Sequence, residues 1–204
     1  MLINIILYIT CFSKKRETRN IFVFYLIYIG LIQLISSILF SQGKPNLFLS
    51  HFYFVGQFIF LSLLYKKILI KKIYKTLINS AFIIVCTVVT IQYILFPKLF
   101  FTFNLFEIII SSIPIIFYSF LFFFESIANI NKQYIYINAG VFIYLSSSTL
   151  LFCAGNLINA SASSYKKLIW EINMILYGVY LILIFVEWYK NFRNPSKKKL
   201  KIYD

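Results

Sequence analysis

The feature that most constrains this chain is a series of apolar runs separated by short polar connections. A helix needs roughly 20 apolar residues to cross a hydrocarbon layer about 30 Å thick. Along the 204 residues the runs are Met1–Phe12, Ile21–Ser41, Leu47–Leu64, Leu77–Phe96, Leu99–Phe124, Tyr134–Ile158 and Leu168–Tyr189. The pattern predicts an all-α fold, a polytopic transmembrane helix bundle.

The number of spans depends on the first run. Met1–Phe12 would reach only about 18 Å as a helix, so we expect seven spans, or six if this run does not cross. The chain is 61% hydrophobic and 13% charged, which leaves no segment from which to build a soluble domain. We therefore expect a helical bundle over residues 1–189 and a basic cytoplasmic tail over residues 190–204.

The basic residues predict the orientation. Sixteen of the 20 fall in alternate connections and in the tail: Lys14, Lys15, Arg16, Arg19, Lys66, Lys67, Lys71, Lys72, Lys75, Lys132, Lys190, Arg193, Lys197, Lys198, Lys199 and Lys201. The opposite side has Lys44, Lys98, Lys166 and Lys167. Because basic residues concentrate on the cytoplasmic side of membrane proteins, we expect a multi-pass protein of the bacterial inner membrane with its C-terminus in the cytoplasm.

Residues suited to catalysis or metal binding are scarce. A catalytic zinc site needs about three His, Asp or Glu ligands, and His51 is the one histidine. Its spacing from Glu107 and Glu171 does not support a joint site. Cys11, Cys86 and Cys153 lie in apolar runs and form no C-x-x-C pair. We expect no cofactor, no metal and no enzymatic activity, and an intramembrane enzyme ranks third among the functional hypotheses.

Polar residues within the apolar runs are candidates for a ligand pocket or pore. Asn104, Glu107, Ser111 and Pro114 recur on one helical face. The full candidate set is Gln33, His51, Gln57, Asn104, Glu107, Ser111, Asn156, Glu171 and Asn173. One interpretation is a polar pocket open to the outside, with Glu107 and Glu171 as its ionisable members. The other is that each polar group bonds a neighbouring helix and fixes packing, with Glu171 solvated beside Lys167.

A channel is the alternative function. Glu107, Ser111 and the Ser146–Thr149 run would line it, and it would require a homo-oligomer. Small residues in the sixth run also allow helices to approach closely, so this pattern serves either packing or a pore.

The inner face is the second candidate surface. Lys66-Lys67-Ile68-Leu69-Ile70-Lys71-Lys72 is expected to extend a helix past the membrane. The basic docking residues are Lys66, Lys67, Lys71, Lys72, Lys75, Lys197, Lys198, Lys199 and Lys201. Anionic lipid head groups are one partner, and an acidic surface of a cytoplasmic protein is the other. Nucleic acid would be met only indirectly, through that partner.

Two stretches carry a resemblance to known proteins. They are His51-Phe52-Tyr53-Phe54 continuing through Gln57 to Leu64, and Asn138-Ala139-Gly140-Val141 continuing through Ser148 to Asn156. With the helix order, they resemble a family of small seven-helix membrane proteins of Bacteroidota, which implies a sensor-like or regulatory module. In size, hydropathy and composition the chain is also similar to the small membrane accessory protein of type VI-B, RNA-targeting CRISPR loci, which implies a role in antiviral defence.

Together these observations predict a non-enzymatic membrane protein of regulatory or sensor-like type. It would modulate a cytoplasmic partner through its basic inner face, as an accessory of an RNA-targeting CRISPR system if the second resemblance holds.

Overall fold

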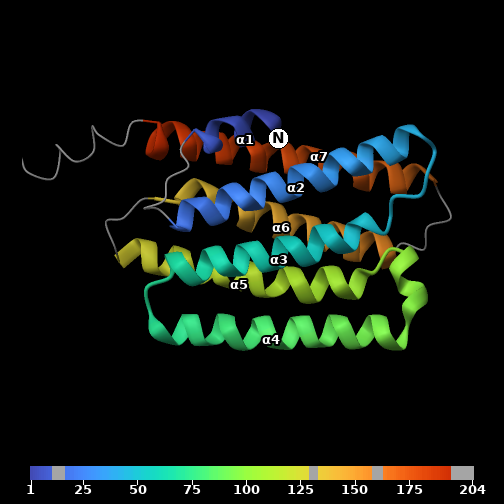
Figure 1. The fold of residues 1–204 in the computed structure, drawn as a ribbon, viewed down its shortest axis with the longest axis horizontal. Coiled ribbons are helices and arrows are strands. Elements are labelled where there is room, and N and C mark those ends of the chain that lie inside the picture. Colours follow the sequence, from blue (N-terminus) through green and yellow to red (C-terminus); the bar gives the residue numbers. More distant parts are fainter. Residues whose placement is uncertain (11–16, 129–132, 158–162, 194–204) are drawn as a thin grey trace, which may run out of the picture.

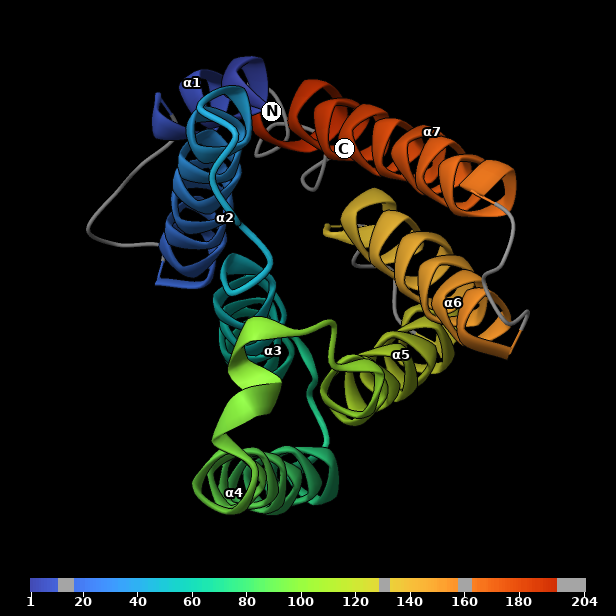
Figure 2. The same ribbon diagram turned by 90° about the vertical axis from the view of Figure 1, so that its right-hand side faces the viewer.

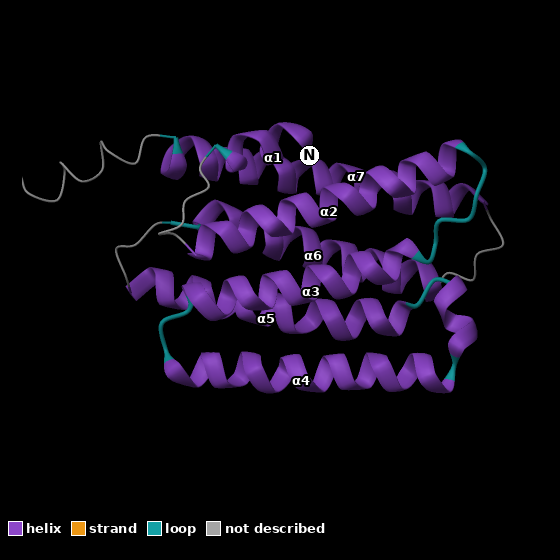
Figure 3. Ribbon diagram, viewed as in Figure 1, coloured by secondary structure: helices purple, strands orange, loops and turns teal. Residues whose placement is uncertain are grey.

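A computed structural model describes residues 1–10, 17–128, 133–157 and 163–193 (Figure 1). The long helices are α2 (Glu17–Ser41), α3 (Leu49–Ile68), α4 (Lys72–Leu95), α5 (Leu105–Ala128), α6 (Ile135–Leu157) and α7 (Ser163–Glu187). The shorter ones are α1 (Leu2–Ile9), the 3-10 turn η1 (Pro97–Phe101) and the π-helical turn η2 (Trp188–Phe192). No strand occurs in the described ranges, which confirms the all-α prediction (Figure 3).

The helices form a ring that α1 closes over part of its length, with one helix outside it (Figure 2). Around the ring, α2 packs on α3, α3 on α5, α5 on α6 and α6 on α7, and α1 joins α7 back to α2. Helix α4 lies outside the ring against α3 and α5. All helices that are consecutive in the sequence therefore contact each other, and α3 in addition packs directly on α5.

Five helical segments are long and apolar enough to cross a membrane: Glu17–Ser41, Lys72–Leu95, Leu105–Ile127, Ile135–Asn156 and Lys167–Phe192. Helix α1 has eight residues and a length of about 12 Å, which is too short to cross. Helix α3 is long enough but less apolar. The expectation of seven spans is thus not confirmed, and the described residues of the first run fit the shorter alternative.

The composition of α3 follows from its place in the ring. Its polar residues His51, Gln57 and Ser62 are buried against other helices. Outward-facing positions of the bundle are instead large and apolar, as at Ile83, Ile94 and Phe120. Polar side chains inside and large apolar side chains outside are typical of a bundle whose surroundings are apolar.

Two element boundaries differ from the sequence prediction. The lysine-rich stretch is not one continuous helix: α3 ends at Ile68, the backbone is extended at Leu69 and Lys71, and α4 begins at Lys72. The fifth run does not become α-helical at Leu99. A 3-10 turn ends at Phe101, and α5 begins at Leu105 after Asn104, whose side-chain oxygen accepts the backbone N–H of Glu107 at 3.3 Å.

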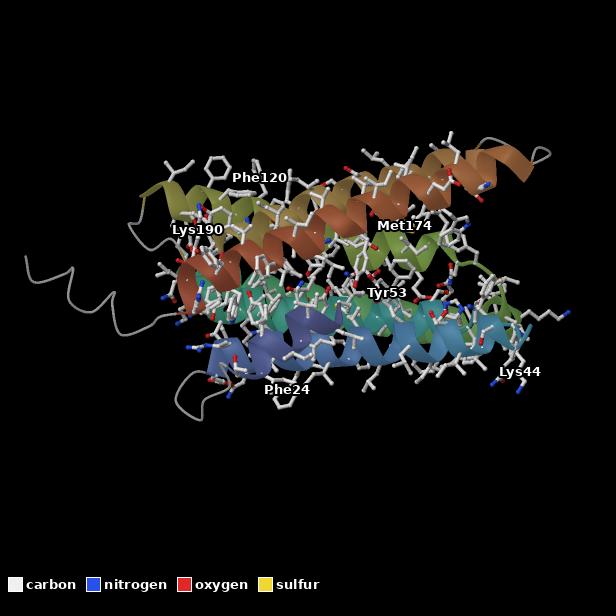
Figure 4. All side chains as sticks on the ribbon, turned by 90° about the horizontal axis from the view of Figure 1, so that it is seen from above. Phe24, Lys44, Tyr53, Phe120, Met174 and Lys190 are labelled. Carbon is white, nitrogen blue, oxygen red and sulfur yellow. The ribbon has the colours of Figure 1, made fainter. Side chains whose placement is uncertain are left out.

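The helices also place the charged residues at two opposite ends. Lys66, Lys67, Lys71, Lys72 and Lys75 lie at the junction of α3 and α4, on the same end of the bundle as Lys190 (Figures 1 and 4). Lys44, between α2 and α3, marks the other end (Figure 4). We call these the basic end and the distal end. The tail lysines Lys197, Lys198, Lys199 and Lys201 lie outside the described residues.

Candidate functional site

A cavity of about 680 Å³ lies inside the distal half of the ring. Four helices form its walls: the second halves of α2 and α6, and the first halves of α3 and α7. The loop before α5 adds Phe103. The lining is Ile32, Gln33, Ser36, Ser37, Phe40, Asn46, Leu47, Leu49, Ser50, Tyr53, Phe54, Phe103, Tyr144, Phe152, Trp170, Asn173, Met174 and Tyr177. It combines aromatic walls with uncharged hydroxyl and amide groups, as small-molecule sites do.

Tyrosines close the cavity on the side of the basic end. Tyr144 stacks on Tyr180 with ring centroids 5.5 Å apart, and the Tyr53 and Tyr144 hydroxyls lie 3.4 Å apart. Beneath them, the Tyr25 hydroxyl accepts hydrogen bonds from Tyr180 and from the Gln57 amide, each at 3.2 Å. This tyrosine layer therefore joins α2, α3, α6 and α7, and any change in its packing reaches all four helices.

A second polar cluster lies outside the cavity, where α3, α4 and α5 meet. Nδ1 of His51 lies 2.7 Å from Oε2 of Glu107, and Nε2 of His51 lies 3.0 Å from the Phe100 carbonyl oxygen. The Tyr93 hydroxyl donates to the same Glu107 oxygen, and it accepts from the Asn104 amide at 3.1 Å. The cluster is almost closed to solvent, since Glu107 is 0% exposed and His51 5%.

The remaining hydrogen bonds of this cluster are internal. Asn104 also bonds Gln92 through both amide groups, and the Ser111 hydroxyl donates to the Glu107 carbonyl oxygen at 2.7 Å. Oε1 of Glu107 is buried and has no hydrogen-bond partner among the described residues. The cluster thus holds one carboxylate oxygen firmly and leaves the other unused.

The structure divides the single polar pocket expected from the sequence. Gln33 and Asn173 line the cavity, and Gln57 lies in the tyrosine layer below it. His51, Asn104, Glu107 and Ser111 belong to the separate cluster on α3 and α5. The cause is the direct packing of α3 on α5, which turns these residues away from the centre of the ring.

Two candidates face outward. Asn156 is exposed, and the Glu171 carboxylate lies 3.7 Å from the Lys167 ammonium on the surface of α7. The structure thus does not bring Glu107 and Glu171 together in one pocket, and Glu171 lies beside Lys167 on the surface.

The residues proposed to line a channel do not share a cavity. Glu107 and Ser111 lie in the α3–α5 cluster, and the Ser148 hydroxyl donates to Oδ1 of Asn173 at 2.7 Å. Among the described residues, no group of three or more His, Cys, Asp or Glu side chains is placed to hold a metal ion.

Two carboxylates at the basic end were not singled out from the sequence. Glu125 accepts the backbone N–H groups of Ile70 and Lys71 at 2.9 and 3.1 Å, directly before α4. Glu187 accepts those of Tyr134 and Tyr136 at 2.7 and 3.0 Å, at the start of α6. Each thus caps the N-terminus of a different helix, where a negative charge is favourable. Each stands at the end of a long apolar run, on the side where the basic residues concentrate, and this is the sequence signal that could have identified them.

No protein-family model, no curated protein and no solved structure matches the chain.

Proposed function

We propose that this chain is a non-enzymatic integral membrane protein of receptor or sensor type. The distal cavity takes up a ligand, and the basic end contacts a cytoplasmic partner whose activity it regulates. The single observation that carries the proposal is the arrangement of these two features: a partly polar cavity and a lysine-rich surface occupy opposite ends of one helical ring, with the tyrosine layer between them.

Insertion in a membrane is supported by five long apolar helices and by the apolar outer surface. In the orientation that the positive-inside rule favours, the basic end faces the cytoplasm and the cavity lies in the outer half of the bilayer. We propose six spans, formed by α2 to α7, in the inner membrane, with α1 embedded between α2 and α7.

A ligand in the cavity can act on the basic end through rigid helices. Tyr53, Tyr144 and Tyr177 line the cavity and are also part of the tyrosine layer or packed on it. Repacking these rings would shift α3, α6 and α7 relative to one another. Helix α3 ends at the lysine-rich junction, so such a shift would move the docking surface.

A channel has less support. The tyrosine layer closes the cavity toward the basic end, and the proposed pore residues lie in different sites. A pore would therefore have to form between copies of the chain.

The partner that we propose is an acidic cytoplasmic protein. The resemblance to the accessory protein of type VI-B CRISPR loci makes the RNA-targeting nuclease the first protein to test.

The test is purification of the tagged chain from its native host in gentle detergent, at about 0.1 M and about 1 M salt, where the Debye length is about 10 and about 3 Å. We expect a partner that is lost at high salt and that is also lost when Lys66, Lys67, Lys71 and Lys72 are changed to Gln. A matched variant changes Lys44, Lys98 and Lys167 at the distal end to Gln and should retain the partner. A partner that survives the first set of changes would refute docking at the basic end.

A further inference from the structure

We infer that the cavity binds an uncharged amphipathic lipid, which enters from the bilayer through an opening between α2 and α7. The inference rests on the proposed function, because it names the ligand class for the same cavity.

The opening exists because α1 covers only part of the seam between α2 and α7. Asn4 and Tyr8 of α1 donate to backbone carbonyls of α7, at Leu181 and Ile184, over 2.9 and 3.0 Å. Both contacts lie in the half of the seam nearest the basic end. Met1 lies level with the cavity, where its sulfur accepts from the Tyr177 hydroxyl at 3.4 Å. Beyond this level α2 and α7 diverge toward the distal end (Figure 4).

The side chains at the opening are those of a lipid-facing surface. Phe40, Trp170 and Met174 line the cavity and are 77%, 54% and 68% exposed. The opening lies on the side of the bundle that Figure 4 faces, where Met174 is seen on α7 and Tyr53, which comes from α3, is seen between α7 and α2. In the orientation proposed above, this side faces the hydrocarbon layer. A ligand dissolved in the bilayer therefore reaches the cavity without crossing water.

The polar groups of the cavity fit an uncharged head. None of the described residues that line it is an Asp, Glu, Lys or Arg, so an ionised head group would be buried there without a counter-charge from them, at a high cost in free energy. Tyrosine hydroxyls can donate or accept, and the amide nitrogen of Asn173 has two N–H groups, so that it can donate to a ligand as well as to the neighbouring Tyr144 hydroxyl, while its oxygen accepts from Ser148. Hydroxyl, ester and amide groups are the heads that such a site recognises. The volume of about 680 Å³ is sufficient for such a head and part of a chain.

Intrinsic fluorescence provides the test, since the chain has two tryptophans and one of them lines the cavity. In a Trp188→Phe background, Trp170 is the one remaining tryptophan, so the tryptophan fluorescence comes from the cavity wall. The full chain in lipid nanodiscs is titrated with a monoacylglycerol brominated on its acyl chain, which quenches tryptophan on contact. We expect quenching that saturates at a low mole fraction of probe. A lysophosphatidic acid with the same brominated chain should bind at least tenfold more weakly. Quenching that rises linearly for both probes, or equal saturation by both, would overturn the inference.

Variants place the site. Asn173→Leu removes the donor and should weaken monoacylglycerol binding at least fivefold, and Asn173→Phe should abolish saturation by placing a ring where the head group would lie. Thr90→Val, on the exposed face of α4, removes one hydroxyl that bonds only its own helix and should bind as the parent does. Equal binding by Asn173→Phe and Thr90→Val would show that the probe lies elsewhere.

Failure of the inference can be told from failure of the proposed function. Suppose that quenching saturates with neither lipid, but Asn173→Phe alters retention of the salt-sensitive partner. The ligand class is then wrong and the receptor function stands. If the lipid saturates but neither it nor Asn173→Phe alters partner retention, the site is confirmed and the receptor function falls.

Discussion

The imidazole of His51 and the carboxylate of Glu107 lie 2.7 Å apart in a buried site that joins α3 to α5. With Tyr93 they also attach α4, the helix outside the ring. Buried polar pairs of this kind fix one arrangement of helices among several that are equally apolar. The pair therefore explains how α4 finds its place in a bundle whose surfaces are otherwise alike.

Removing one member of this pair should be far more harmful than removing both. His51→Leu removes the imidazole and leaves the buried Glu107 side chain with the Tyr93 hydroxyl alone, which we expect to cost about 3–5 kcal/mol of unfolding free energy. In His51→Leu/Glu107→Leu, Asn104 still bonds Tyr93, and stability should return close to that of the parent. Thermal unfolding of the two single variants and the double variant in detergent measures this coupling. Additive losses would contradict the account.

Two helical glycines provide a matched comparison of close packing. A Cβ at Gly56 would clash with the Tyr28 ring, whose hydroxyl donates to the Phe52 carbonyl oxygen, whereas a Cβ at Gly178 would meet nothing within 4 Å. Gly56→Ala should destabilise the bundle by about 1–3 kcal/mol through overpacking. Gly178→Ala should be neutral, or stabilising by up to about 1 kcal/mol, because alanine favours helix. Thermal unfolding of the two variants decides; equal effects would show that α2 and α3 do not approach as described.

The carboxylate of Glu125 should stabilise the junction between α3 and α4. Glu125→Ala removes the acceptor for two backbone N–H groups and should cost about 0.5–2 kcal/mol, as the loss of a helix cap does. Glu171→Ala is the control, because its ion pair with Lys167 is exposed and contributes at most about 1 kcal/mol. Hydrogen exchange of the Ile70 and Lys71 amides, measured by mass spectrometry of the peptide that contains them, should accelerate in the first variant alone. Unchanged exchange would exclude the capping role.

The sequence predicted the helices better than it predicted their arrangement. Runs of about 20 apolar residues located α2 to α7, because helix length in a membrane follows from hydrocarbon thickness. The shared face of Glu107 and Ser111 was also predicted, and both are buried. These features depend on local spacing alone.

The arrangement depends on which face of each helix packs on which neighbour, and the spacing of residues along the chain does not determine this. Nothing in the sequence places α4 outside the ring or α3 against α5, since each helix has several apolar faces of similar character. For that reason the approach of His51 to Glu107 was missed, and Glu171 was grouped with residues that it does not meet. Helices α3 and α5 both begin at the distal end, and His51 and Glu107 lie in their first turns. This was the available signal that the two side chains lie at the same depth in the membrane.

The central claim is that the basic end faces the cytoplasm and the distal end faces the opposite side of the membrane. Cysteine labelling tests this claim most directly. In a background where the native cysteines are replaced, Lys44→Cys and Lys72→Cys each provide one thiol, at the distal and the basic end; the replaced residues are Cys11, Cys86 and Cys153. In intact spheroplasts a membrane-impermeant maleimide should label Lys44→Cys, and it should label Lys72→Cys only after lysis. Labelling of Lys72→Cys in intact spheroplasts, or a chain found in the soluble fraction, would contradict the account.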